Sequence, residues 1–200
     1  MPDVAIVGGG PAGLSAALFT AKNDLETVVF DTDETWMHKA HLFNYPGIRS
    51  ISGSEFMELT RGQVRDRGAD VHVGEEVSDV DPGDDGFRVE TSVASETQRA
   101  DGEAVDEDGE YEADYVVLAT GADRSVAEDL GVDFADDGTV DVDLDTETSI
   151  DDLYATGAMV RDEEWQAVIA AGDGASAALD ILSKEKGEHF HDFDVPDDVA

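Results

Sequence analysis

The sequence contains no cysteine and only 12 lysine and arginine residues, against 49 aspartate and glutamate residues. The lack of cysteine excludes a disulfide framework, thiolate metal ligands and a redox-active dithiol on this chain. The shortage of basic residues leaves a formal net charge of −37. Because the electrostatic field of such a charge repels nucleic acids and anionic membranes, we expect neither as a partner. No apolar run approaches the ~20 residues that a transmembrane helix requires.

The acidic residues are spread between well-patterned apolar segments. This favours a folded domain with a solvated acidic surface over a disordered acidic protein, and it is typical of proteins that work in the high-salt cytoplasm of a halophile. The first residues, MPDVAIV, carry no basic region and lead directly into a strand pattern, so we expect no signal peptide and a cytoplasmic location.

The stretch VAIVGGGPAGLSAALF, residues 4–19, is typical of a nucleotide-binding strand, turn and helix. Gly8, Gly10 and Gly13 fit the G-x-G-x-x-G pattern, whose glycines allow a tight turn, close approach of a pyrophosphate and packing of the helix on the strand. Apolar residues at helical spacing over 14–21 predict a helix whose N-terminus faces the phosphates. The sequence therefore favours a nucleotide site over a merely structural glycine turn.

A second strand, TVVF at residues 27–30, ends at Asp31, where an acid would accept hydrogen bonds from a ribose. The rest of the chain continues as α/β and predicts one domain over residues 1–187, with an acidic C-terminal tail over 188–200. The further elements expected are a helix over 54–68, strands over 69–73, 87–93 and 115–122, hairpin connections over 95–115 and a last helix ending near residue 187.

Five motifs in order resemble the FAD domain of the thioredoxin reductase family, over nearly the whole chain. They are GGGPAGLSAAL (8–18), NYPG (44–47), GSEFMELTRGQVRDRGADV (53–71), ADYVVLATGA (113–122) and LYATGAMVRDEEWQAVIAAGDGASAAL (153–179). The resemblance implies FAD as the cofactor. It also implies a Rossmann-like three-layer α/β fold with a five-stranded parallel sheet, a three-stranded antiparallel meander and flanking helices.

The resemblance further implies a set of cofactor-binding residues. The glycine turn would hold the pyrophosphate, the acid after the second strand would bind the adenosine ribose, and an asparagine would lie near the isoalloxazine. The amides that begin the last helix would stabilise negative charge on the reduced ring. The residues at matching positions are Gly8, Gly9, Gly10, Pro11, Ala12, Gly13, Asp31, Asn44, Thr120, Gly121, Ala122, Gly157, Ala158, Trp165, Gln166 and Ala167.

The sequence departs from the family pattern in three places. Ala158 follows Gly157 where the family carries aspartate, so an expected contact with FAD is missing. Trp165 takes the place of a common arginine; it could cover the isoalloxazine or be an ordinary core aromatic. Only residues 122–156 stand where the family inserts its NAD(P)H domain and Cys-x-x-Cys pair.

We therefore expect an FAD-dependent oxidoreductase that requires a redox partner protein, or a small-molecule donor or acceptor, for one half-reaction. No residue is a convincing general base or nucleophile, so the catalytic residues are unknown. The alternatives are a non-catalytic FAD-binding module, a redox sensor or an NAD(H)-binding protein. A homodimer is compatible with the family resemblance.

Other patterns give weaker signals. GDGASA at 172–177 matches G-x-G-x-x-A but lies in a helical pattern, so we interpret it as a chance match. Residues 141–152 approach calcium-loop spacing without the required glycine, and we expect no metal site. His38 and His41 could tune the flavin or have packing or surface roles. The two histidines of EHFHDFD are expected to be solvated.

The acidic surface predicts that salt stabilises the fold. Raising KCl from low salt into the molar range should raise the unfolding temperature, because the Debye length shrinks from about 10 Å at 0.1 M to about 3 Å at 1 M and screens the repulsion. Thermal unfolding followed by circular dichroism measures this. A flat or falling profile would contradict the halophilic interpretation.

Overall fold

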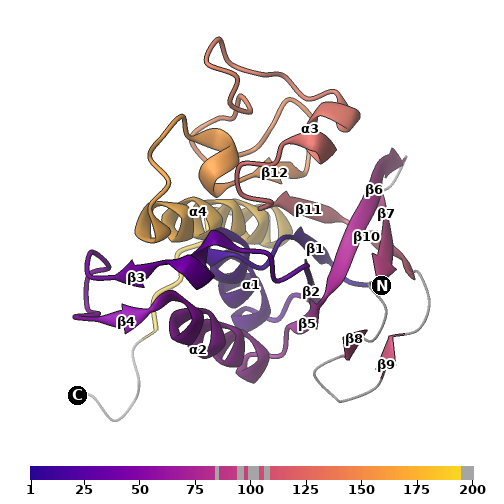
Figure 1. The fold of residues 1–200 in the computed structure, drawn as a ribbon. Coiled ribbons are helices and arrows are strands. Elements are labelled where there is room, and N and C mark those ends of the chain that lie inside the picture. The colour runs from indigo at the N-terminus through magenta and orange to yellow at the C-terminus, as the bar shows by residue number, and fades with distance from the viewer. Residues whose placement is uncertain (84–85, 94–96, 99–103, 106–108, 195–200) are drawn as a thin grey trace.

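Five short apolar strands form the central parallel sheet of the computed structural model, in the order β12–β11–β1–β2–β5 (Figure 1). The structure describes residues 1–83, 86–93, 97–98, 104–105 and 109–194. The strands of the parallel sheet are β1 (Val4–Val7), β2 (Thr27–Asp31), β5 (Asp70–Val73), β11 (Tyr115–Leu118) and β12 (Leu153–Ala155). A second, antiparallel sheet has the order β10–β7–β6, with β6 (Glu75–Gly83), β7 (Gly86–Val93) and β10 (Gly109–Ala113).

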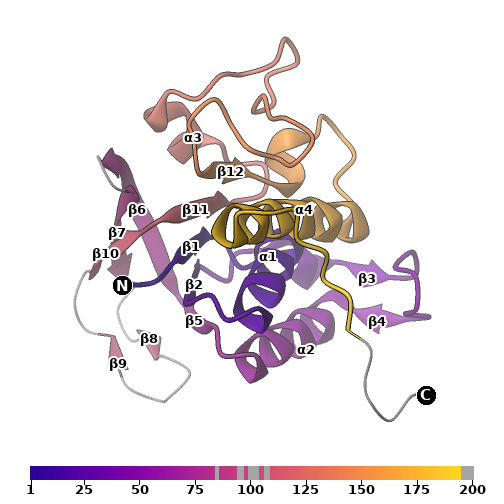
Figure 2. The same ribbon diagram turned by 180° about the vertical axis from the view of Figure 1, so that it is seen from behind.

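The three longer helices cover one face of the parallel sheet, and the antiparallel sheet and the short helix Ser125–Leu130 cover the other (Figures 1 and 2). Both faces are therefore largely buried, which is why the central strands β1 and β11 are continuously apolar or aromatic. In β1, Val4 and Ile6 pack on the helix side, whereas Ala5 and Val7 pack toward the antiparallel sheet. The helices are α1 (Pro11–Lys22), α2 (Gly53–Asp66), α3 (Ser125–Leu130) and α4 (Ala167–Lys186), with 3-10 turns η1 (Trp36–Lys39) and η2 (Gly157–Val160).

Small two-stranded ladders complete the described elements. They are β3 (His41–Leu42) with β4 (Ile51–Ser52), and β8 (Thr97–Gln98) with β9 (Ala104–Val105). No helix within the described ranges is both long and apolar enough to cross a membrane.

The five-stranded parallel sheet and the three-stranded antiparallel sheet confirm the expected fold. Strand β6 belongs to the antiparallel sheet that the resemblance implied, but its position was not identified in the sequence, because the strand is acidic and a register shift between Val77 and Asp79 breaks its alternation. Strand β10 lies in the segment expected to form only connections, and much of the remainder of that segment lies outside the described residues. The expected helix over 54–68 is α2, which begins where the Ser52 hydroxyl accepts a hydrogen bond from the Glu55 amide, 3.2 Å.

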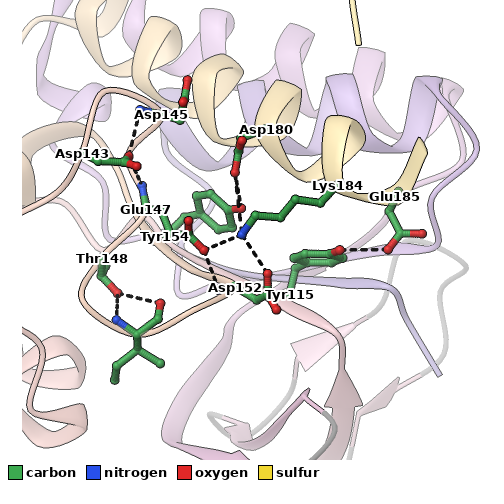
Figure 3. Close-up of polar contacts among 11 residues, drawn as sticks. Tyr115, Asp143, Asp145, Glu147, Thr148, Asp152, Tyr154, Asp180, Lys184 and Glu185 are labelled. Carbon is green, nitrogen blue, oxygen red and sulfur yellow. Dashed lines mark hydrogen bonds and ion pairs between the residues drawn. The ribbon is translucent and has the colours of Figure 1, made fainter. Parts of the chain in front are cut away.

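The segment between β11 and β12 is fastened to α4 by one lysine (Figure 3). The Lys184 ammonium donates to Asp152 at 2.8 Å and to Glu147, and lies 5.2 Å from the centre of the Tyr154 ring. The Tyr154 hydroxyl donates to Asp180 of the same helix, 2.7 Å. One cation of α4 thus pairs with two acids of the segment between β11 and β12.

The expected acidic tail, residues 188–200, is described as far as residue 194. Its Asp192 and Asp194 each lie 2.5 Å from the ammonium of Lys22, at the end of α1. The first half of the tail therefore runs back along the helical layer, as Figure 2 shows.

Helices α1 and α4 approach closely through a glycine. A Cβ added at Gly174 would lie 2.0 Å from the backbone oxygen of Ala12, whereas a Cβ at Gly172 would meet no atom within 4 Å. The sequence GDGASA thus lies inside α4, as its helical pattern indicated, and its second glycine serves helix packing.

These two glycines provide a matched test of the packing. Gly174→Ala should lower the free energy of unfolding by about 1–3 kcal/mol or more, because the helices must separate. Gly172→Ala should raise it by about 0.5–1 kcal/mol, because alanine is the better helix former and nothing obstructs it. Urea unfolding of both variants in high KCl measures the difference, and equal effects would contradict the close approach.

Candidate functional site

Two glycines at sterically crowded positions and one at an open position form the turn after β1. Gly8 has a φ of +106°, and a Cβ there would lie 2.4 Å from the carbonyl oxygen of Ala119. A Cβ at Gly13 would lie 1.9 Å from the oxygen of Gly8, so this glycine lets α1 pack on the turn. Gly10 has no atom within 4 Å of its Cβ position, and it precedes a helix whose first turn has neither a side-chain cap nor an acid. The open glycine and the uncapped amides form a place for an anion.

A cavity of about 750 Å³ opens at this turn, within the size range of ligand sites. Its walls come from the carboxyl ends of β1, β2 and β11, from η2 and from the start of α4. All the site residues expected from the sequence line it except Gly13, which lies behind the turn, and Asn44. The Asn44 amide donates to the side-chain oxygen of Gln166, 2.7 Å, and so joins the β3 hairpin to the start of α4.

The acid at the end of β2 is held from behind by an arginine. Asp31 is 5% exposed, and its carboxylate lies where a Cβ at Gly9 would be, 2.4 Å from the nearest oxygen. Arg61 of α2 donates to Asp31 at 2.6 Å and also to Asp33. Burial alone would raise the pKa of Asp33, but hydrogen bonds from Arg61 and His38 hold that pKa below its usual value. The hydrogen bond from Arg61 fixes the Asp31 carboxyl group in the cavity wall.

Both tryptophans of the chain meet at the cavity mouth. Trp36 of η1 and Trp165 before α4 lie edge to face, with ring centres 5.9 Å apart. They are 72% and 43% exposed, and both line the cavity. The Trp165 indole NH donates to the backbone oxygen of Arg161, 3.0 Å. Trp165 is therefore not a core residue, and no local sequence pattern indicated its partner Trp36.

The turn at Gly157, where η2 begins, packs against the start of α1. Gly157 has a φ of +70°, and a Cβ there would lie 3.1 Å from the Cβ of Ala12. Arg124 donates to the backbone oxygens of Met159 and Ala158, at 3.0 and 3.4 Å. The turn that carries Ala158 is thus held by its backbone against the start of α1.

The two histidines considered for the flavin do not line the cavity. His38 is hydrogen-bonded to Ser54 at 2.9 Å and to Asp33 at 2.8 Å, so it joins η1 to α2. His41 is hydrogen-bonded to Ser50 at 2.9 Å and lies 4.5 Å from the Phe43 ring. Both have local structural partners.

The residues at calcium-loop spacing are also engaged locally. Asp143 accepts hydrogen bonds from the amides of Asp145 and Glu147, at 2.9 and 3.0 Å, and Figure 3 shows Glu147 directed toward Lys184. In the described part of the chain, no three His, Asp or Glu side chains are grouped to hold a metal ion.

A buried histidine and glutamate lie at the β2 side of the cavity, and sequence reasoning missed them. His72 is 2% exposed and is hydrogen-bonded to Glu75 and Asp70, both at 2.8 Å. Glu75, which lines the cavity, also accepts from Thr91 at 2.5 Å. Burial lowers the pKa of His72, but hydrogen bonds to Asp70 and Glu75 outweigh it and raise the pKa to about 9.

Comparison with known proteins by sequence matches this chain to one protein family. The family model of the pyridine nucleotide-disulphide oxidoreductases matches residues 2–126 and 44–175. A dihydrolipoyl dehydrogenase of Haloferax volcanii is 30% identical over 183 residues, which cover 90% of this chain and 34% of that protein. A thioredoxin reductase of Listeria monocytogenes is 30% identical over 125 residues, covering 61% of this chain and 34% of the reductase.

The fold has matching solved structures. A thioredoxin reductase from Gloeobacter violaceus superposes with a TM-score of 0.77 at 20% identity, with 98% of each chain covered. At this identity the likeness shows the fold. The chain spans about a third of the length of the two curated relatives.

The His72 cluster predicts a pH dependence of stability. A folded-state pKa of about 9 against 6.5 means that the native state binds an extra proton between these values. The contribution of this cluster to the free energy of unfolding is therefore complete below pH 6.5, and it is lost as the pH rises through about 9. Urea unfolding of the wild type across this range, with His72→Gln as the control, should show a downward slope that the variant lacks; equal slopes would contradict the raised pKa.

Proposed function

Because the chain belongs to the pyridine nucleotide-disulphide oxidoreductase family, we propose that it binds FAD in the cavity and works as a flavin-dependent redox protein. The supporting observation is that four segments of the chain line one cavity. They are the glycine turn, Asp31, the turn at Gly157 and the start of α4. A merely structural glycine turn would not require an open Gly10 beside an uncapped helix.

The residues fit an extended dinucleotide. The uncapped start of α1 would hold the pyrophosphate, and Asp31, fixed by Arg61, would accept hydrogen bonds from the adenosine ribose. The isoalloxazine would lie at the opposite end, near the Asn44–Gln166 hydrogen bond. The backbone at Gly121 and Ala122 would border it, since both line the cavity.

When bound, FAD supplies the redox chemistry, and the protein supplies binding, orientation and electrostatics. The amides that begin α4, after Gln166, would stabilise negative charge on the ring, because a helix N-terminus carries partial positive charge. Trp36 and Trp165 would limit the access of water to the same end of the cavity.

The redox cycle is proposed to need a second component. This sequence has no cysteine, and only residues 122–156 separate Gly121 from Gly157, so it offers no dithiol relay and little chain to hold a nicotinamide. A redox partner protein, or a small-molecule donor or acceptor, would complete one half-reaction. A homodimer in the cytoplasm of a halophile is the setting we propose.

The test combines binding and reduction. The purified protein should take up FAD, show flavin absorption bands and lose tryptophan fluorescence by energy transfer, because both tryptophans lie at the mouth. Dithionite should reduce the bound flavin fully, whereas NADH and NADPH should reduce it slowly, since oriented approach of two rings is worth about 7–11 kcal/mol of barrier. Thioredoxin should not be reduced. Anaerobic stopped-flow spectroscopy measures the rates.

The variant that tests binding is Gly10→Val, whose Cβ would have no protein atom within 4 Å and whose side chain would occupy the ligand side of the turn. It should fold normally and lose FAD, whereas Gly62→Ala, also in open space but on α2, should keep it. A wild type that remains colourless with added FAD would overturn the proposal. Full reduction by NADH or NADPH at rates on the order of tens per second would show a self-sufficient enzyme with its own nicotinamide site.

A further inference from the structure

The cavity presents an electrostatic problem for an anionic ligand. The carboxylates on its lining belong to Asp31, Glu34, Glu75, Glu76, Asp123 and Glu164, whereas its cationic side chains are Lys39 and Arg161. A pyrophosphate would enter a strongly acidic site in a chain of net charge −37. The partial charge of one helix N-terminus is worth about 0.3–2 kcal/mol, which leaves a need for a fixed cation.

Arg161 is such a fixed cation. Its Nη2 donates to Oδ1 of Asp173 at 2.6 Å, and its Nε donates to Oδ2 of the same carboxylate at 3.2 Å. Asp173 is 6% exposed, so the anchoring group is buried in α4. Paired hydrogen bonds of this kind fix the plane and direction of a guanidinium. The Arg161 side chain is itself 40% exposed, so it is accessible from the cavity, whereas Lys39 on η1 is exposed and pairs with no carboxylate among the described residues.

The anchor lies beside the start of α1. Gly174, the neighbour of Asp173, packs on the backbone of Ala12, and Gly157 packs on the Ala12 side chain from the other direction. Arg161 follows directly after η2, which begins at Gly157. Its guanidinium is therefore tied to the same corner of the cavity as the uncapped amides of α1. Ala158, in the same turn, brings no carboxylate against it.

We propose that Arg161, oriented by Asp173, binds the phosphates of the dinucleotide and offsets the acidic lining of the cavity. This inference rests on the proposed FAD function and adds a specific binding residue to it. Arg161 acts through its side chain on the phosphates, whereas Asp173 is a positioning residue that acts through Arg161. The ligand class recognised at this corner is a diphosphate, whatever ring system is attached.

The test compares ligands with and without phosphates. Arg161→Gln should weaken the binding of FAD and of ADP by about tenfold or more, the usual effect of losing a charge-assisted hydrogen bond. Riboflavin, which has no phosphate, should bind equally well to wild type and variant. Binding is measured by tryptophan and flavin fluorescence at fixed KCl. Raising KCl should weaken the binding of ADP less in the variant than in the wild type, because one ionic contact is missing.

Three further variants sharpen the result. Asp173→Asn should weaken ADP binding in the same direction but less, because it loosens the guanidinium without removing it. Arg88→Gln, an exposed arginine on β7 paired with Asp81, should leave every affinity unchanged. Arg161→Lys keeps the charge and should recover part of the ADP affinity. This variant also provides the measurement if Arg161→Gln does not fold, as judged by its thermal unfolding profile.

The outcomes separate the inference from the proposed function. If the wild type binds neither FAD nor ADP, both the proposed function and the role of Arg161 are overturned. If the wild type binds FAD and Arg161→Gln binds it equally, only the role of Arg161 is overturned. An equal loss of riboflavin and ADP affinity would also overturn it, because that result indicates a general disturbance of the cavity.

Discussion

The close approach of backbones around the first turn of α1 is the constraint on which the rest of the structure depends. Gly13 brings the helix onto the turn after β1, Gly174 brings α4 onto Ala12, and Gly157 brings η2 onto the same residue. Side chains at these positions would move three segments apart. Because the cavity is the space left between these segments and the ends of β2 and β11, its shape depends on these contacts. The glycines are thus as much part of the site as the residues that face it.

Several of the few basic residues hold this acidic chain together by pairing with acids that lie far from them in sequence. Lys22 joins α1 to the tail, Lys184 joins α4 to the segment before β12, and Arg61 joins α2 to the end of β2. Exposed ion pairs contribute little individually, but a cation shared by two acids also relieves the repulsion between them. In a chain with so large an excess of acids, the position of each cation therefore decides which segments can lie together.

The sequence predicted the parts of the fold that local periodicity encodes. β1, α1 and β2 follow from apolar runs and helical spacing, and α4 follows from a long helical pattern that ends at Gly187. The resemblance extended this to the two sheets. The position of β6 was not predicted, because acids fill its exposed positions and its register with β7 shifts. The partners of the site residues were not predicted for another reason. The contacts of Trp36 with Trp165 and of Arg61 with Asp31 join distant segments, and no local pattern specifies them.

The two ends of the cavity differ in a way that fits a protein with an external redox partner. At the β2 end, Asp31 is buried and fixed by Arg61, so a ribose would meet a prearranged acceptor. At the opposite end, Trp36 and Trp165 are 72% and 43% exposed and contact each other across two segments of the chain. Exposed aromatic rings of this kind are also the residues that favour protein contacts. The rigid end would hold the cofactor, while the open end would give another molecule access to its redox-active ring.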